Sequence, residues 1–146
     1  MARWPGWAVS LVVVALDQGA KAWVAAILAP GQSQPLLGNF LRLTRVHNPG
    51  AAFGLFPEGK TAFLVTSLVV VGGLFLYLLL GRPQGLRAWG GVFLLGGALG
   101  NLLDRARLGY VVDLFSVGRF PVFNVADAAL VLGAGLFALG LWRRPR

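Results

Sequence analysis

The 146-residue sequence has no cysteine and only one histidine. Without cysteine, the chain cannot form a disulfide, use a thiol nucleophile or bind a metal through thiolates, and the redox compartment cannot be inferred. A single histidine argues against a histidine-based zinc site and a Ser/His triad. Acidic residues are also scarce, since five stand against 13 Lys and Arg, giving a net charge of +8. The basic residues occur singly or in pairs between apolar runs, so we expect anionic lipid headgroups as their partners and no nucleic acid.

Charged residues make up only 12% of the chain, whereas 57% of it is hydrophobic and its mean hydropathy is +0.73. These values lie outside the range of soluble domains and indicate a membrane protein. A helix needs about 20 mostly apolar residues to cross the bilayer. Four segments come close to that length, at about 7–28, 61–80, 88–103 and 121–142. The sequence therefore predicts one all-α integral membrane domain over residues 1–146, with four transmembrane helices.

The first segment has a second interpretation as a secretory signal. Arg3 precedes the apolar run AVSLVVVAL, and AKA resembles a small-x-small cleavage site. The three later segments need a membrane-inserted context. In addition, the polar residues Asp17 and Gln18 would be unusual at the end of the apolar region of a signal peptide. We therefore favour a transmembrane helix.

Two longer connections, at about 30–60 and 104–120, should lie on one side of the membrane, opposite both termini and the short GRPQGLR turn. LRLTRV alternates like a short strand, VG could turn a small hairpin, and AAFGLF could be an amphipathic interfacial segment. We expect a small extracytoplasmic subdomain of β-like structure with an interfacial helix. Lys and Arg number six on each side and do not decide the orientation. The terminal side has no acidic residue, as a cytoplasmic face would.

The first ionisable pair lies within an apolar segment. Ionisable groups at membrane depth are costly, so they are usually paired, face a wet cavity or have a function. Asp17 and Lys21 are spaced i, i+4 and share one helix face. Taken alone, they predict an intrahelical ion pair that helps the segment to insert.

The third segment carries polar residues on one face near its end. Asn101 and Arg105 are four residues apart, and Gly96 and Gly100 form a G-x-x-x-G pattern that permits close helix approach. We expect Asp104, at the same end, to pair with a nearby arginine. Helix packing explains the two glycines but not Asn101, because a buried side-chain amide needs a hydrogen-bond partner.

Asp113 and Asp127 lie fourteen positions apart around the start of the fourth segment, whose helix we expect to begin at Pro121. Two carboxyl groups in a poorly hydrated pocket cannot both ionise cheaply, so they share a proton. Such a pair can activate a water for attack on a peptide carbonyl and protonate the leaving amine. Spacing alone leaves two alternatives open. The aspartates could form a proton relay, or they could be counter-ions for Arg105, Arg107 and Arg119.

Four blocks, LDQGAKAWV, HNPGAAFGLF, GGALGNLLDRARLGYVVDLF and FPVFNVADAAL, occur in this order and span the first to the fourth segment. Together they resemble the lipoprotein signal peptidase family, signal peptidase II, of bacteria. The resemblance implies a multi-pass enzyme of the bacterial cytoplasmic (inner) membrane, with cytoplasmic termini and an active site near the extracytoplasmic face. Family members are intramembrane aspartic proteases that cut prolipoproteins just before a cysteine carrying a diacylglyceryl group.

The resemblance also implies site residues. The V-V-D-[FL] and F-N-x-A-D blocks place the two catalytic aspartates at Asp113 and Asp127. Residues implied to support the site or bind substrate are Asp17, Lys21, Asn48, Asn101, Arg105 and Asn124. The family commonly has threonine after the asparagine of N-x-G-A-A-F, where this chain has Pro49, which lacks a backbone donor.

A mechanism with these residues requires no metal or organic cofactor, and we expect the chain to act as a monomer on a lipid-modified prolipoprotein. The 30–60 excursion could then clamp the lipidated cysteine; the alternative is an ordinary connecting loop resting on the surface.

Two rival functions remain open from the sequence. A small proton-coupled transporter would use its aspartates as a relay. A structural subunit without chemistry would use its glycines to pack against partner helices and would tolerate asparagine in place of either aspartate.

Overall fold

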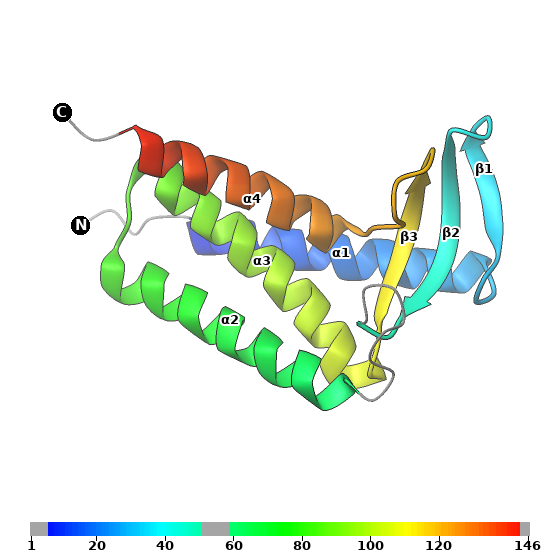
Figure 1. Ribbon diagram of the computed structural model, residues 1–146, viewed down its shortest axis with the longest axis horizontal. Coiled ribbons are helices and arrows are strands. Elements are labelled where there is room, and N and C mark those ends of the chain that lie inside the picture. The colour runs from blue at the N-terminus through cyan, green and yellow to red at the C-terminus, as the bar shows by residue number, and fades with distance from the viewer. Residues whose placement is uncertain (1–5, 51–58, 144–146) are drawn as a thin grey trace.

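The computed structural model describes residues 6–50 and 59–143, in which four helices are long and apolar enough to cross a membrane (Figure 1). Many of their large apolar side chains are exposed, such as Leu80 and Val131, as expected for surfaces that face lipid. The chain is therefore a multi-pass membrane protein. Its elements, in order, are α1 (Gly6–Ile27), β1 (Ser33–Leu37), β2 (Leu41–Asn48), α2 (Lys60–Gly81), α3 (Gly85–Leu108), β3 (Val111–Val117) and α4 (Val125–Trp142).

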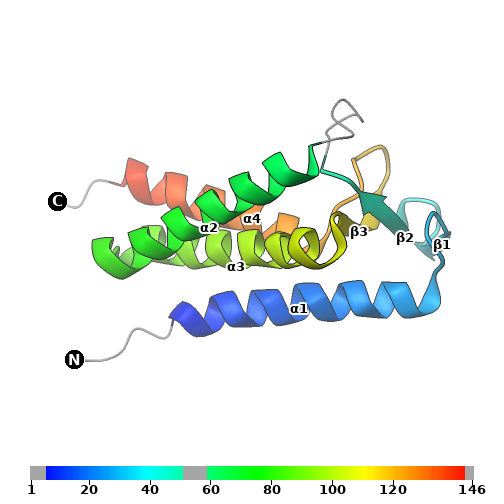
Figure 2. The same ribbon diagram turned by 90° about the horizontal axis from the view of Figure 1, so that it is seen from below.

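Helix α3 is the central element of the bundle and packs against each of the other three helices. In Figure 2, α1 lies on one side of α3, and α2 and α4 lie on the other. The start of α1 and the end of α4 lie at one end of the bundle, and the three strands lie at the other (Figure 1). The strands of both longer connections therefore lie opposite the start of α1 and the end of α4, as the sequence predicts.

Glycines allow this close packing around α3. A Cβ atom on Gly96 would lie 2.8 Å from the Cβ of Val13, and one on Gly100 would lie 2.6 Å from an Asp17 carboxylate oxygen. The predicted G-x-x-x-G pattern is thus confirmed as the contact of α3 with α1. Gly97 plays the same part toward α4, because its Cβ would lie 2.5 Å from the Ala126 carbonyl oxygen.

Replacing Gly97 with alanine should destabilise the bundle by about 1–3 kcal/mol, since the added methyl group must push the first turn of α4 away. The measurement is thermal unfolding in detergent. Gly135→Ala is the matched control, because a Cβ there meets nothing within 4 Å. Equal melting temperatures for the two variants would contradict the close α3–α4 contact.

The strands form one antiparallel sheet in the order β1-β2-β3. Leu43 of β2 and Val112 and Leu114 of β3 pack on α1, around Val24 and Leu28. Because successive side chains of a strand point to opposite faces, the side chain that lies between Val112 and Leu114 points away from α1. That side chain is a carboxyl group, so the sheet anchors β3 on the bundle and turns one buried acid toward the start of α4.

The fold confirms the predicted class, four membrane helices with a small β subdomain, and the strand predicted at LRLTRV lies in β2. Helix α3 runs on to Leu108, so residues 104–108 are helical instead of part of the connection. The predicted helix start at Pro121 is wrong, because Phe123 forms a bridge with Phe115 and α4 begins at Val125. The predicted interfacial segment AAFGLF lies outside the described residues.

Candidate active site

Because α4 begins at Val125 and not at Pro121, Asp127 occupies the third position of this helix. Asn124 precedes the helix as its N-cap: its Oδ1 accepts a hydrogen bond of 2.8 Å from the Asp127 N–H. In return, Asp127 Oδ2 accepts a hydrogen bond of 3.2 Å from the Asn124 N–H. This reciprocal capping box fixes the side chains of both residues at the end of α4 nearest the sheet.

The same asparagine reaches the other aspartate. Asn124 is fully buried, and its Nδ2 donates to Asp113 Oδ1 at 2.9 Å and to the Val112 carbonyl at 3.2 Å. Asp113 on β3 and Asp127 on α4 are thus held on either side of one amide. The structure brings together the two carboxyl groups that the sequence left fourteen positions apart.

Two further amides complete the hydrogen bonding of the carboxyl groups. Asn101 Nδ2 donates to Asp127 Oδ1 at 2.9 Å, and Asn48 Nδ2 donates to Asp113 Oδ2 at 3.1 Å. Asn48 Oδ1 accepts from the Gly50 N–H at 2.9 Å, so the turn through Pro49 is closed by the donor of the following residue. This hydrogen bond does not need a backbone donor at position 49.

Asp113 is a weaker acid than an ordinary aspartate. Burial raises its pKa to about 6, with a further upward contribution from the nearby Asp127, against the hydrogen bonds from Asn48 and Asn124, which lower it. A carboxyl group with this pKa can hold a proton under mildly acidic conditions and release it near neutrality.

Lys21 links three buried polar side chains that lie next to the two candidate catalytic aspartates. It is almost fully buried, and its Nζ lies 2.7 Å from Asp17 Oδ2 and 2.9 Å from Asp104 Oδ2, and donates to Asn101 Oδ1 at 3.2 Å. The predicted Asp17–Lys21 pair is confirmed. The predicted pairing of Asp104 with an arginine is wrong: α3 turns this carboxylate toward α1, where it meets the lysine.

This network also reaches the backbone of both site elements. Asp104 Oδ2 accepts from the Val112 N–H of β3 at 2.9 Å, and Asp17 Oδ1 accepts from the Ala126 N–H of α4 at 2.9 Å. The ion cluster therefore fixes β3 and α4 one residue away from each candidate catalytic aspartate.

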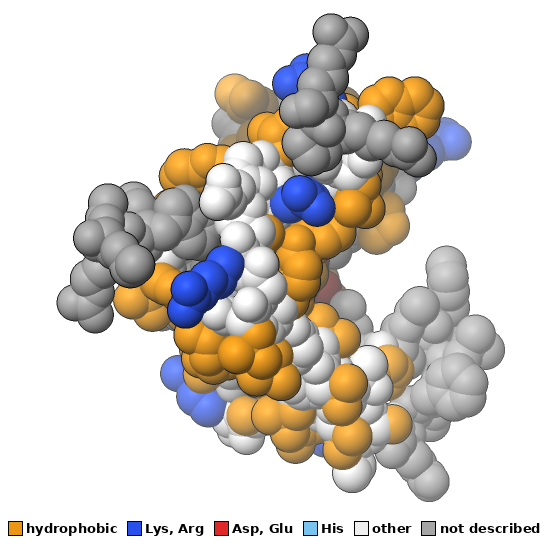
Figure 3. All heavy atoms as spheres, turned by 90° about the vertical axis from the view of Figure 1, so that its left-hand side faces the viewer, with side chains coloured by type: hydrophobic (Ala, Val, Ile, Leu, Met, Phe, Trp, Pro, Cys, Tyr) orange, Lys and Arg blue, Asp and Glu red, His pale blue; other side chains and the backbone are white. Residues whose placement is uncertain are grey.

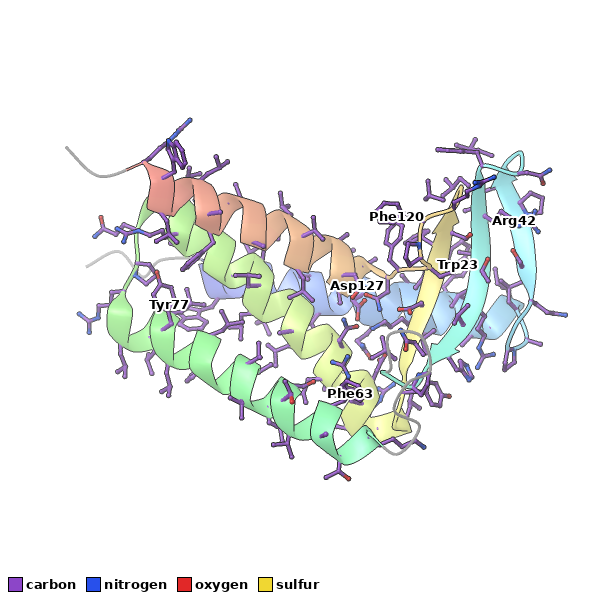
Figure 4. All side chains as sticks on the ribbon, viewed as in Figure 1. Trp23, Arg42, Phe63, Tyr77, Phe120 and Asp127 are labelled. Carbon is purple, nitrogen blue, oxygen red and sulfur yellow. The ribbon has the colours of Figure 1, made fainter. Side chains whose placement is uncertain are left out.

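A cavity of about 270 Å³ lies beside Asp127, between α2, α3 and α4. Figure 4 shows Asp127 at the sheet end of α4 and Phe63 on the neighbouring part of α2. The exposed surface of the walls is mostly apolar; the lining residues are Phe63, Thr66, Ser67, Val70, Ala98, Asn101, Arg105, Asp127 and Leu130. The carboxyl group of Asp127 therefore borders a cavity with a largely apolar surface.

Arg105 extends into this cavity from α3. One guanidinium nitrogen donates to Ser67 Oγ at 2.9 Å. Its Nε is buried and has no hydrogen-bond partner in the described part of the chain. A buried donor without a partner costs free energy, which a substrate carbonyl oxygen could recover.

Two further side chains, which the sequence patterns do not predict, contribute to the site. Gln18 Nε2 donates to Asp104 Oδ1 at 3.0 Å and to the Gly100 carbonyl at 3.1 Å, which ties α1 to α3 beside the ion cluster. Ser67 accepts the hydrogen bond from Arg105. Two sequence features could have pointed to these residues: Gln18 directly follows Asp17, and Ser67 is a polar residue within an apolar helix. Within residues 6–50 and 59–143, no group of three or more His, Asp or Glu side chains could hold a metal ion.

Comparison with known proteins gives concordant matches. The family sequence model described as "Signal peptidase (SPase) II" matches residues 9–143. Relatives named "Lipoprotein signal peptidase" include proteins from Halothermothrix orenii, 41% identical over 94% of this chain and 95% of the relative, and from Moorella thermoacetica, 46% identical over 85% and 83%. Two solved structures described as a bacterial membrane enzyme are both 29% identical to this chain. Their TM-scores are 0.86 and 0.87, over 94% and 96% of this chain and 87% and 94% of the solved chains.

Proposed function

The chain belongs to the signal peptidase II family, and on that premise we propose that it removes signal peptides from diacylglyceryl-modified prolipoproteins by aspartic protease chemistry. The observation that carries the proposal is the single amide of Asn124, which donates to Asp113 while its residue caps the helix turn of Asp127. The two carboxyl groups are linked through Asn124, and one of them, Asp127, lines a cavity whose exposed walls are mostly apolar, which supports this chemistry.

In the proposed mechanism, the two carboxyl groups hold a water between them. Asp127, which accepts hydrogen bonds from Asn101 and its own helix cap, is the ionised member and takes a proton from the water as its oxygen attacks the scissile carbonyl carbon. Asp113, whose pKa is raised to about 6, carries the shared proton and gives it to the leaving nitrogen when the carbon–nitrogen bond breaks. A proton then passes from Asp127 back to Asp113, and the cycle is complete.

The other polar residues of the site hold the geometry of attack. Asn48, Asn101 and Asn124 orient the carboxyl groups. The Nε of Arg105, which has no hydrogen-bond partner among the described residues, donates to a substrate carbonyl oxygen. Asp17 and Lys21 act as positioning residues, because they contact Asn101 and the α4 backbone instead of the proposed reaction centre. We propose that the sheet end of the bundle is extracytoplasmic, that the 30–60 excursion covers the lipidated cysteine, and that the chain acts as a monomer.

The function can be tested with purified protein in detergent and one prolipoprotein in two forms, with and without the diacylglyceryl group on its cysteine. We expect the modified form to be cut immediately before the cysteine, as read from the mass of the released signal peptide. The unmodified form should remain intact under the same conditions. Equal cutting of the two forms would contradict recognition of the lipid, and cutting of neither would contradict the proposed activity.

The raised pKa of Asp113 predicts the pH dependence. Below about pH 6 this carboxyl group keeps its proton, so kcat/KM should fall as pH rises through an apparent pKa near 6. The hydrogen bond from Asn48 lowers the pKa of Asp113, so its removal in Asn48→Ala should move this fall to higher pH. Asn39→Ala, at the exposed turn between β1 and β2, is the control and should leave the profile in place. A shift of the Asn48→Ala profile to lower pH would rule out Asp113 as the proton carrier.

A further inference from the structure

A second hollow lies at the opposite end of the bundle from the aspartates. Its volume is about 670 Å³, and it is bounded by the last turn of α2, the α2–α3 turn and the C-terminal end of α4. We call it the basic hollow; its lining includes Tyr77, Arg82, Arg87, Gly140 and Arg143. None of them takes part in the site described above.

Three arginines share this hollow, and no described residue offers them a compensating charge. Among residues 6–50 and 59–143, Arg82, Arg87 and Arg143 have no carboxylate within ion-pair distance, and both ion pairs belong to Lys21. The four described acidic residues lie in the network around Lys21 and Asn124 at the other end of the bundle. Cations gathered around one concave surface repel one another and favour an anion between them.

The start of α3 adds to this positive potential. Its N-cap, Gln84, makes no side-chain hydrogen bond to the helix, and the first turn contains no acidic residue. The free N–H groups at a helix start attract anions, particularly phosphate. The arginines and the helix end therefore point to the same ligand chemistry, a phosphate group.

The surroundings of the hollow indicate that the phosphate belongs to a lipid. Trp7 near the start of α1, Trp89 in the second turn of α3 and Trp142 at the end of α4 lie at this end of the bundle. Tryptophans at helix ends are typical of the headgroup level of a membrane. Leu80 and Leu141, which adjoin the hollow in sequence, are exposed and provide apolar surface for acyl chains. Figure 3 views this end directly, and Figure 4 marks Tyr77 beside it.

We propose that the basic hollow binds the phosphate of one anionic phospholipid from the leaflet on the side of the chain termini. Arg82, Arg87 and Arg143 surround the phosphate, and the Tyr77 hydroxyl provides a neutral donor. The acyl chains lie along the exposed Leu80 at the end of α2 and Leu141 at the end of α4. The headgroup therefore bridges the α2–α3 turn and the end of α4, two parts of the chain that approach one another here.

Native mass spectrometry of the full-length protein in detergent can test this site, with phosphatidylglycerol titrated against phosphatidylcholine. We expect saturable binding of one phosphatidylglycerol and a clear preference over phosphatidylcholine. The triple variant R82Q/R87Q/R143Q should bind phosphatidylglycerol about a hundredfold more weakly, because each arginine near a headgroup contributes about fivefold. The matched control K60Q/R107Q/R119Q removes the same charge from exposed positions at the other end and should bind like the parent.

Three results would overturn the proposal. Equal weakening in the two triple variants would show general attraction by net charge instead of a site. Binding that never saturates would show a diffuse lipid layer. Displacement of the phospholipid by inorganic phosphate at an equal concentration would assign the hollow to free phosphate. Circular dichroism and the three single arginine variants accompany the assay, so that a stepwise loss of binding in folded protein can be separated from unfolding.

Discussion

Replacing either Asp113 or Asp127 with asparagine should lower kcat for prolipoprotein cleavage by about 10⁴-fold or more. Asparagine keeps the shape of the side chain and can still hydrogen-bond to Asn124, so the fold should survive. It cannot accept a proton from water or carry the shared proton, so each variant lacks one half of the proposed dyad. The measurement is single-turnover cleavage of the diacylglyceryl-modified substrate, with melting temperatures for both variants.

Asp104→Asn is the matched control for these variants, because it makes the same change at a buried carboxylate that contacts Lys21 and not the two candidate catalytic aspartates. It should lower the melting temperature while folded molecules keep most of their rate. If Asp113→Asn or Asp127→Asn cuts as fast as the parent, the dyad assignment fails. A structural subunit without chemistry would cut neither as the parent nor as a variant, so cleavage by the parent already decides between the two functions.

Replacing Lys21 with methionine should cost about 3–5 kcal/mol of stability, the second large effect. Lys21 is the cation between Asp17 and Asp104, at 2.7 and 2.9 Å, and all three side chains are buried. Without the ammonium group, the two carboxylates face each other unpaired, and Asn101 Oδ1 keeps only the donor from Asn124. Thermal unfolding in detergent measures the loss, and cleavage rates should fall along with the folded fraction.

A double-mutant cycle separates this ion cluster from simple packing. In Lys21→Met with Asp104→Asn, one of the two unpaired charges is gone, so the double variant should be more stable than Lys21→Met alone. The amide oxygen that the second substitution introduces can still accept the hydrogen bond from the Val112 N–H, which keeps β3 in place. Additive losses in the cycle would mean that the lysine and Asp104 act independently.

A proton-coupled transporter fits the arrangement poorly. A relay needs titratable groups across the depth of the membrane. The four described aspartates instead lie in one connected cluster near the sheet, at a single end of the bundle. The opposite end carries the basic hollow, whose described lining includes arginines and no acidic residue.

Local patterns in the sequence were sufficient for the helices and for one ion pair. Apolar runs of about 20 residues must be helical in a membrane because every backbone hydrogen bond must be made within the segment. The i, i+4 spacing of Asp17 and Lys21 fixes their shared face, and the glycine pattern at positions 96 and 100 marks a close contact. The resemblance of the four blocks supplied the family and the aspartates.

Local patterns failed where a residue's partner lies in a different structural element. Asp104 looked like a helix-end partner of an arginine, since the sequence shows only its neighbours in the same helix. The helix start at Pro121 was misplaced because the pairing of Phe123 with Phe115 depends on β3 lying beside it. Neither the bridge nor the Lys21–Asp104 pair can be read from spacing.

The sequence by itself determined a four-helix membrane protein of this family, because hydrophobic length and motif order are properties of the linear chain. Only the tertiary structure decided that one amide, Asn124, serves both aspartates, that Lys21 joins α1 to α3, and that three arginines enclose a separate hollow. These features depend on how closely the helices approach around the glycines of α3. Hydrogen bonds and ion pairs act over a few ångströms, a distance that packing sets and that sequence separation does not reveal.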